Sequence, residues 1–86
     1  MYKVQIEKRA GKVLRKLPVD IINRITPVLQ KLQNEPHPAG SRKISGCEST
    51  YRIRVGNYRI IYEVLKEQVT ILVIMVGHRK DVYRNL

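Results

Sequence analysis

Tyr51–Tyr62, which reads YRIRVGNYRIIY, has the residue pattern of a β-hairpin. On both sides of a central Gly56-Asn57, apolar residues alternate with arginines. This alternation is the period of a strand with one buried face and one wet face. Gly56-Asn57 suits a two-residue hairpin loop, because such a loop requires positive φ. The stretch therefore predicts two antiparallel strands in which Val55 lies opposite Tyr58.

The predicted register sorts the side chains of this hairpin onto two faces. One face is apolar, and the other carries Arg52, Arg54 and Arg59. Arg54 falls directly opposite Arg59, and like charges facing each other destabilise a ladder. One interpretation is a solvated strand face in a very basic protein. The interpretation that we adopt is a preorganised anion site, because guanidinium groups on a rigid hairpin are suited to binding phosphate.

The length and composition predict one small domain, residues 1–86, with 43% hydrophobic residues to build a core. Seventeen Lys and Arg against seven Asp and Glu give a net charge of +10. Such a charge implies a polyanionic partner: nucleic acid, an anionic membrane or an acidic protein. The single cysteine, Cys47, cannot form an internal disulfide and fits a reducing cytosol. With no signal peptide or membrane-spanning run, we expect a cytoplasmic protein without a membrane partner.

The other segments predict an α+β fold. Residues 2–7 alternate like a strand, and apolar residues at helical spacing predict helices over residues 10–17 and 21–34. Pro27 is expected either to kink the second helix or to follow a Thr26 cap that begins a fresh turn. Residues 35–41 predict a loop, and residues 42–45 a short strand. We expect a small, mainly antiparallel sheet with both helices on one face and a basic concave face opposite.

Residues 69–76 are almost all apolar and predict an interior strand that follows a turn at Lys66-Glu67. With that turn, Arg59 falls opposite Ile74, and the chain leaves the strand beside the Arg54–Arg59 end of the hairpin. The residues that follow the strand, including a short tail, then join the arginine side chains there. The resulting candidate site consists of Arg52, Arg54, Arg59, Arg79 and Tyr83, with His78 close by.

Several classes of chemistry lack their residues in this sequence. There is no glycine-rich phosphate loop, no paired carboxylate and no cluster spaced like metal ligands. We therefore expect no cofactor and no metal. Two options stay open at this point: phosphate chemistry that relies on positive charge, and simple binding of a polyanion.

The sequence resembles the RelE/ParE superfamily of toxins from bacterial toxin–antitoxin pairs. The resemblance covers nearly the whole chain and rests on RKISG before the hairpin, on YRIRVGNYRIIY, and on the closing VGHR and DVY. Arg59 after an aromatic residue, Arg79 after the last strand and Tyr83 in a Val-Tyr pair match the RelE branch. That branch is similar in fold to microbial ribonucleases and cuts messenger RNA in the ribosomal A site.

The resemblance implies a role for each residue of the candidate site. Arg59 would bind the scissile phosphate, Arg79 would stabilise developing charge or assist the leaving group, and Tyr83 would stack on a base and help proton transfer. Arg52 and Arg54 stand where well-known members carry two lysines. Arginine stays protonated and is a poor general base. Proton abstraction would then fall to Tyr83, to His78 or to a ribosomal group.

The function that this resemblance implies is a ribosome-dependent, metal-independent endoribonuclease, with an acidic antitoxin, the ribosome and mRNA as partners. The alternative is a ParE-like inhibitor of DNA gyrase without nuclease activity, although that branch generally lacks the full arginine and tyrosine set. A third interpretation is a plain RNA-binding module. The hairpin offers no exposed aromatic pair for base stacking, which disfavours this third interpretation.

Overall fold

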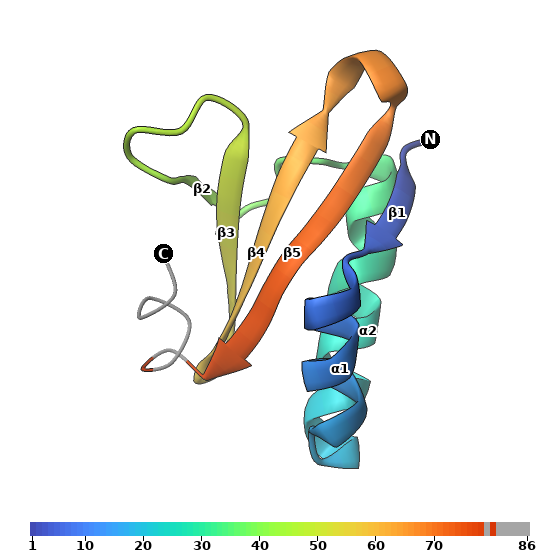
Figure 1. The fold of residues 1–86 in the computed structure, drawn as a ribbon, viewed down its shortest axis with the longest axis vertical. Helices are drawn as coiled ribbons and strands as arrows, with labels where there is room; N and C mark the ends of the chain where they lie inside the picture. Colours follow the sequence, from blue (N-terminus) through green and yellow to red (C-terminus); the bar gives the residue numbers. More distant parts are fainter. Residues whose placement is uncertain (79, 81–86) are drawn as a thin grey trace.

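The computed structural model describes residues 1–78 and residue 80. Within this part, five strands form one sheet in the order β1-β5-β4-β3-β2, and two helices pack on one of its faces (Figure 1). The elements in chain order are β1 Lys3–Ile6, α1 Lys8–Lys16, α2 Val19–Asn34, β2 Arg42–Lys43, β3 Thr50–Val55, β4 Tyr58–Leu65, the 3₁₀ turn η1 Lys66–Gln68 and β5 Thr70–His78. The expected α+β fold with a mainly antiparallel sheet is confirmed, and the parallel ladder joins β1 to β5.

The hairpin of β3 and β4 has the register that the sequence predicts. Val55 pairs with Tyr58, and Arg54 pairs with Arg59. Gly56 has φ of +61° in the loop, a backbone conformation that residues other than glycine rarely adopt. The positions of the arginines on this hairpin are therefore fixed by the alternation in the sequence and by its loop.

The ladder between β4 and β5 differs from the expected one. Arg59 pairs with Gly77 rather than with Ile74. One cause is the turn between β4 and β5, which is longer than the expected Lys66-Glu67. It consists of η1 and Val69, and Val69 lies in the left-handed region at φ of +48°. The other cause is a shift of register between Ile61 and Tyr62, which adds a further residue to β5.

The two helices account for the apolar spacing in the first third of the chain. Pro18 precedes α2, which continues through Pro27 as one helix. The hydroxyl of Thr26 donates to the carbonyl oxygen of Ile22 at 2.9 Å, so Thr26 lies inside the helix and does not cap a fresh turn. The prediction that Thr26 caps a fresh turn was therefore wrong. The helix continues through Pro27 because Pro27 and Asn23 are both exposed, so water can bond to the Asn23 carbonyl that proline leaves without a donor. Neither α1 nor α2 has the length and apolar character that crossing a membrane requires.

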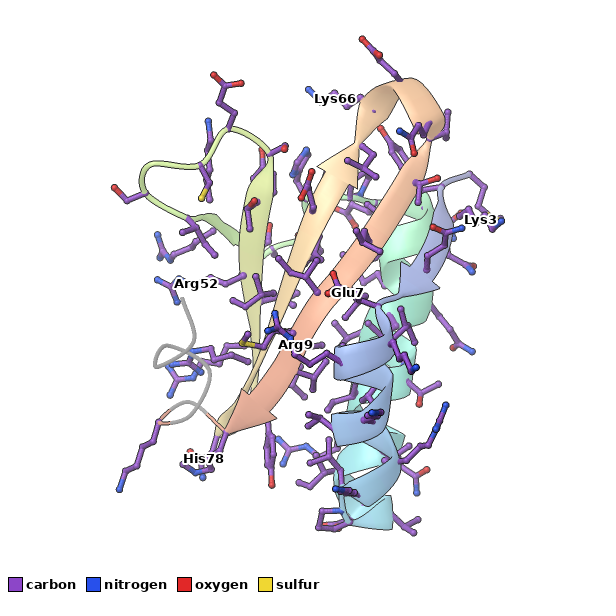
Figure 2. The ribbon with its side chains drawn as sticks, viewed as in Figure 1. Lys3, Glu7, Arg9, Arg52, Lys66 and His78 are labelled. Atoms are coloured by element: carbon purple, nitrogen blue, oxygen red, sulfur yellow. The ribbon has the colours of Figure 1, made fainter. Side chains whose placement is uncertain are left out.

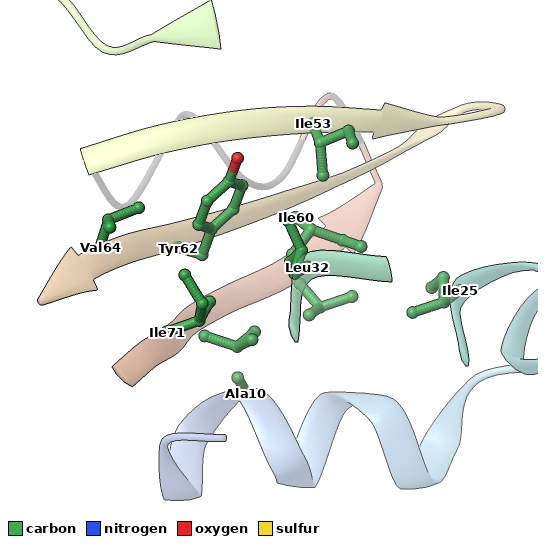
Figure 3. Close-up of a cluster of buried hydrophobic side chains, with 10 residues drawn as sticks. Ala10, Ile25, Leu32, Ile53, Ile60, Tyr62, Val64 and Ile71 are labelled. Carbon is green, nitrogen blue, oxygen red and sulfur yellow. The ribbon is translucent and has the colours of Figure 1, made fainter. Parts of the chain in front are cut away.

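The main core lies between the helices and the sheet (Figure 3). Its fully buried side chains are Ala10, Ile25, Leu32, Ile60, Tyr62, Ile71, Val73 and Val76. Tyr62 is the largest of these, and its hydroxyl donates to the carbonyl oxygen of Pro36 at 2.8 Å. This bond attaches the loop after α2 to the middle of the sheet.

We expect Tyr62→Phe to lower the free energy of unfolding by about 1–2 kcal/mol at neutral pH, because the Pro36 carbonyl loses its donor. Burial raises the pKa of Tyr62 above its ordinary value of 10.0, so the folded chain holds this proton more tightly than the unfolded chain. The stability that this proton provides is present below pH 10 and is lost as pH rises above it. Urea unfolding at a series of pH values measures both effects, and equal losses of stability above pH 10 in the wild type and the variant would contradict the assignment.

Candidate phosphate-binding site

The sheet face turned away from the helices carries the arginines of the hairpin. Ile53 and Ile60 belong to the core on the helix side, so their neighbours along each strand point to the opposite face. Arg52 is half-buried, Arg54 is exposed and Arg59 is buried. Figure 2 shows Arg52 projecting from β3 away from the helices. Farther from the hairpin loop, the same face is apolar: Ile61 and Met75 form a small second cluster there.

Arg59 is the most unusual side chain on this face, because only 9% of its surface is exposed. Within residues 1–78 and 80, neither Nε nor Nη1 of its guanidinium has a hydrogen-bond partner. Its ladder neighbours are Arg54 on β3 and Gly77 on β5, so one is a like charge and the other has no side chain. A buried guanidinium with unpaired N–H groups is costly, and a bound anion removes that cost. An anion with several acceptor oxygens, such as a phosphate group, could supply the missing partners.

Arg54 provides a second guanidinium next to Arg59. Its Nε donates to the carbonyl oxygen of Gly56 at 3.3 Å, which holds the side chain near the hairpin loop. Directly paired residues in a ladder have Cβ atoms about 5 Å apart. An anion that contacts both arginines would therefore relieve their repulsion as well as satisfy the N–H groups of Arg59.

Arg42 is a further member of this face that the sequence did not reveal. It lies on β2 and pairs with Arg52 on β3, and paired residues project to the same side of a sheet. The predicted short strand at residues 42–45 located this segment but did not give its partner or its register. We call Arg42, Arg52, Arg54 and Arg59 the arginine face. Its two pairs, Arg42–Arg52 and Arg54–Arg59, are about 7 Å apart along β3.

His78 lies at the same end of the sheet as Arg59 but on the other face. It pairs with Tyr58, and the two rings meet edge-on with centroids 5.8 Å apart. Its Nδ1 accepts a hydrogen bond from the backbone N–H of Lys80 at 3.3 Å. Figure 2 shows His78 at the end of β5. The described structure thus groups Arg52, Arg54 and Arg59 and places His78 apart from them.

The other two residues of the candidate site, Arg79 and Tyr83, lie outside the described residues. Gly77, which precedes them by a few residues, pairs with Arg59. The expectation that the chain leaves its last strand beside the Arg54–Arg59 pair is therefore confirmed up to His78.

Comparison with known proteins identifies the family. The model of the ParE toxin of type II toxin–antitoxin systems matches residues 4–83. The chain belongs to this toxin family. The match covers both helices, the arginine face and the segment with Arg79 and Tyr83.

Individual relatives of this toxin carry RelE names. Toxin RelE3 of Methanocaldococcus jannaschii is 39% identical over 85 residues, which cover 94% of each chain. The mRNA interferase toxin RelE of Escherichia coli K12 is 30% identical over 81 residues, which cover 92% of this chain and 84% of the relative. In a crystal structure of the archaeal RelE–RelB complex from Pyrococcus horikoshii, a chain with 30% identity matches with a TM-score of 0.82, covering 94% of this chain and 98% of that chain. This chain is therefore a toxin of the RelE/ParE superfamily.

Proposed function

We propose that this toxin is an endoribonuclease that cuts messenger RNA in the A site of the ribosome and so inhibits translation. The observation that carries the proposal is Arg59, a buried guanidinium whose Nε and Nη1 have no partner among the described residues. A relative 30% identical over most of both chains is named an mRNA interferase. A phosphate of the RNA backbone has the charge and the acceptor oxygens that Arg59 requires.

In the proposed reaction, the 2′-hydroxyl of the nucleotide before the cut attacks the adjacent phosphorus. The new 2′-O–P bond forms while the P–O5′ bond breaks, which gives a 2′,3′-cyclic phosphate and a 5′-hydroxyl. Arg59 and Arg54 would stabilise the negative charge that develops on the phosphate oxygens, and Arg79 would assist at the leaving oxygen. No catalytic metal ion takes part in this scheme.

Proton transfer in this scheme requires a group other than the arginines. Arginine is a poor general base, so Arg52 and Arg54 would contact phosphates and would not accept the 2′-hydroxyl proton. We assign to Tyr83 stacking on a nucleobase and acceptance of the 2′-hydroxyl proton, with a ribosomal group as the alternative proton acceptor. The leaving O5′ takes up a proton from solvent, so that one proton is released and one is taken up. His78 is the weaker candidate, because it lies edge-on to Tyr58 on the helix-side face.

The proposed protein partner is a small acidic antitoxin. A chain similar to this one was crystallised in a RelB–RelE antitoxin–toxin complex from Methanococcus jannaschii. An acidic partner complements a chain with a net charge of +10. Covering the arginine face would block the proposed phosphate site. We place this toxin in the cytoplasm, where its proposed substrate is translated.

A gyrase inhibitor is the competing function, because the family model that matches is named for the ParE toxin. The test maps the 5′ ends of mRNA after incubation with the toxin, with and without ribosomes, beside a gyrase supercoiling assay. We expect new 5′ ends only when ribosomes are present, and unchanged supercoiling. Intact mRNA together with inhibited supercoiling would transfer the assignment to gyrase.

A further inference from the structure

The outer edge of the hairpin end has little support from the rest of the sheet. Strand β2 pairs with β3 only through Arg42–Arg52 and Lys43–Tyr51. Within the described residues, β3 therefore has no ladder partner on its outer side from residue 53 to residue 55. Figure 1 shows this end of the hairpin reaching well beyond β2. Arg54, which supplies one guanidinium of the proposed phosphate site, lies in this stretch.

A cavity separates this part of β3 from helix α2. Its volume is about 520 Å³, and its walls include Val28 and Lys31 of α2 and Ile53, Arg54 and Gly56 of the hairpin. Core side chains therefore do not fill the space next to Arg54, and close packing does not hold its backbone in place. Contacts at the rim of the cavity are then the ones that can hold this edge against the helix.

Arg24 of α2 makes such a contact at the hairpin loop. A Cβ atom placed on Gly56 would lie 3.1 Å from both Nη atoms of Arg24 and 3.3 Å from its Cζ. The guanidinium thus lies directly against the backbone of Gly56 and leaves no room for a side chain there. This close approach is a second reason for glycine at position 56, besides its φ of +61°.

Gly56 connects Arg24 to Arg54. The Nε of Arg54 donates to the carbonyl oxygen of Gly56 at 3.3 Å, so the residue that Arg24 contacts also holds the Arg54 side chain. Arg54 in turn faces Arg59 across the ladder. Arg24 thus adds a third guanidinium near two that already repel each other. This arrangement costs stability in the free toxin and becomes favourable when an anion is bound.

We propose that Arg24 is a positioning residue of the phosphate site. It would hold the hairpin loop against α2 and so keep Arg54 beside Arg59, in the orientation that a phosphate group requires. The inference deepens the proposed function and rests on it: the anion is a phosphate of the RNA backbone, and Arg24 acts on it through Gly56 and Arg54. Helix α2 thereby contributes to substrate binding from the helix side of the sheet.

The test measures binding of inorganic phosphate to the free toxin by NMR. The probe is the Nε–H signal of Arg59, which is assigned by its loss in Arg59→Lys. Arg24→Gln loses both the contact and the charge, and Arg24→Lys keeps the charge but loses the planar guanidinium. The control, Lys31→Gln, loses one charge from the wall of the same cavity.

We expect the Kd for phosphate to rise about three- to tenfold in both Arg24 variants and less than about twofold in Lys31→Gln. The reason is that only the Arg24 variants release the hairpin loop. A wild-type Kd in either Arg24 variant would overturn the inference. Equal rises in Arg24→Gln and Lys31→Gln would also overturn it, because the effect would then be one of charge alone.

A double variant tests whether Arg24 acts through Arg54. Arg54→Gln alone should weaken phosphate binding, and adding Arg24→Gln should then change the Kd by less than about twofold, because the group that Arg24 positions is gone. Multiplied losses would show that the two arginines act independently and would overturn the inference. The urea midpoint of Arg24→Gln is expected to match that of the wild type, since Arg24 is exposed. A clearly lower midpoint would make Arg24 a structural residue instead.

Cleavage separates this inference from the proposed function. Single-turnover cleavage on programmed ribosomes should slow by about three- to tenfold in Arg24→Gln, while affinity for the ribosome falls no more than in Lys31→Gln. An unchanged cleavage rate in Arg24→Gln would contradict the inference. A wild type that binds inorganic phosphate at Arg59 but does not cut mRNA would refute the proposed function and leave the phosphate-binding test of Arg24 intact.

Discussion

Arg59→Ala is expected to lower the single-turnover rate of mRNA cleavage on programmed ribosomes by about a hundredfold or more. Removing one preorganised donor to a transition-state oxyanion costs roughly 3 kcal/mol. Affinity for the ribosome should fall much less, since sixteen other Lys and Arg residues contribute to it. An interaction made mainly in the transition state affects the rate and leaves binding nearly unchanged.

Two controls define this effect. Arg59→Lys keeps the charge but loses the planar fork, so we expect a rate between those of alanine and the wild type. Lys66→Ala removes an exposed cation from the turn at the far end of the hairpin and should cut at the wild-type rate.

Arg79→Ala, in the second proposed catalytic position, should resemble Arg59→Ala. Wild-type cleavage by both Arg59→Ala and Arg79→Ala would show that the proposed active site is wrong.

Arg59 is also expected to reduce the stability of the free toxin. Because Nε and Nη1 of the buried Arg59 have no partner among the described residues, Arg59→Met is expected to raise the free energy of unfolding by about 1–3 kcal/mol. The thioether chain fills a comparable volume without polar atoms. Urea unfolding in a buffer free of phosphate and sulfate measures the difference.

The control for this stability effect is Arg52→Met, on the same face. Arg52 is half-buried, so its replacement is expected to change stability by less than about 0.5 kcal/mol. Added inorganic phosphate should stabilise the wild type by mass action and should stabilise Arg59→Met less. A clear loss of stability in Arg59→Met would mean that this arginine is a structural residue with satisfied hydrogen bonds, and not a site waiting for an anion.

The hairpin was predictable from sequence because two local signals agree there. Strict alternation fixes which side chains share a face, and Gly56-Asn57 fixes the loop length, so the pairing of Arg54 with Arg59 followed from the sequence. The β4–β5 register was not predictable in the same way. A 3₁₀ turn and a register shift near Ile61 each add residues without a recognisable motif, and together they moved the partner of Arg59 by three positions.

The candidate site was predictable in its composition and less so in its environment. Arg59 was identified from its strand position and from the family resemblance, but its burial depends on neighbours that the sequence does not place. Arg42 escaped notice because a two-residue strand carries no periodicity from which a register could be inferred. The face assigned to His78 depends on the β4–β5 register, and the observed register places it beside Tyr58.

The central claim is that this toxin promotes attack of a 2′-hydroxyl on the neighbouring phosphate of ribosome-bound mRNA. The most direct measurement is single-turnover cleavage of a programmed mRNA with one 2′-deoxy nucleotide immediately before the mapped cut. The control mRNA carries the 2′-deoxy nucleotide one position further upstream. We expect the first mRNA to stay intact and the control to be cut at the normal rate, to a 2′,3′-cyclic phosphate and a 5′-hydroxyl. Equal cleavage of both mRNAs would contradict the mechanism, because a nucleophile other than the 2′-hydroxyl would then be attacking the phosphate.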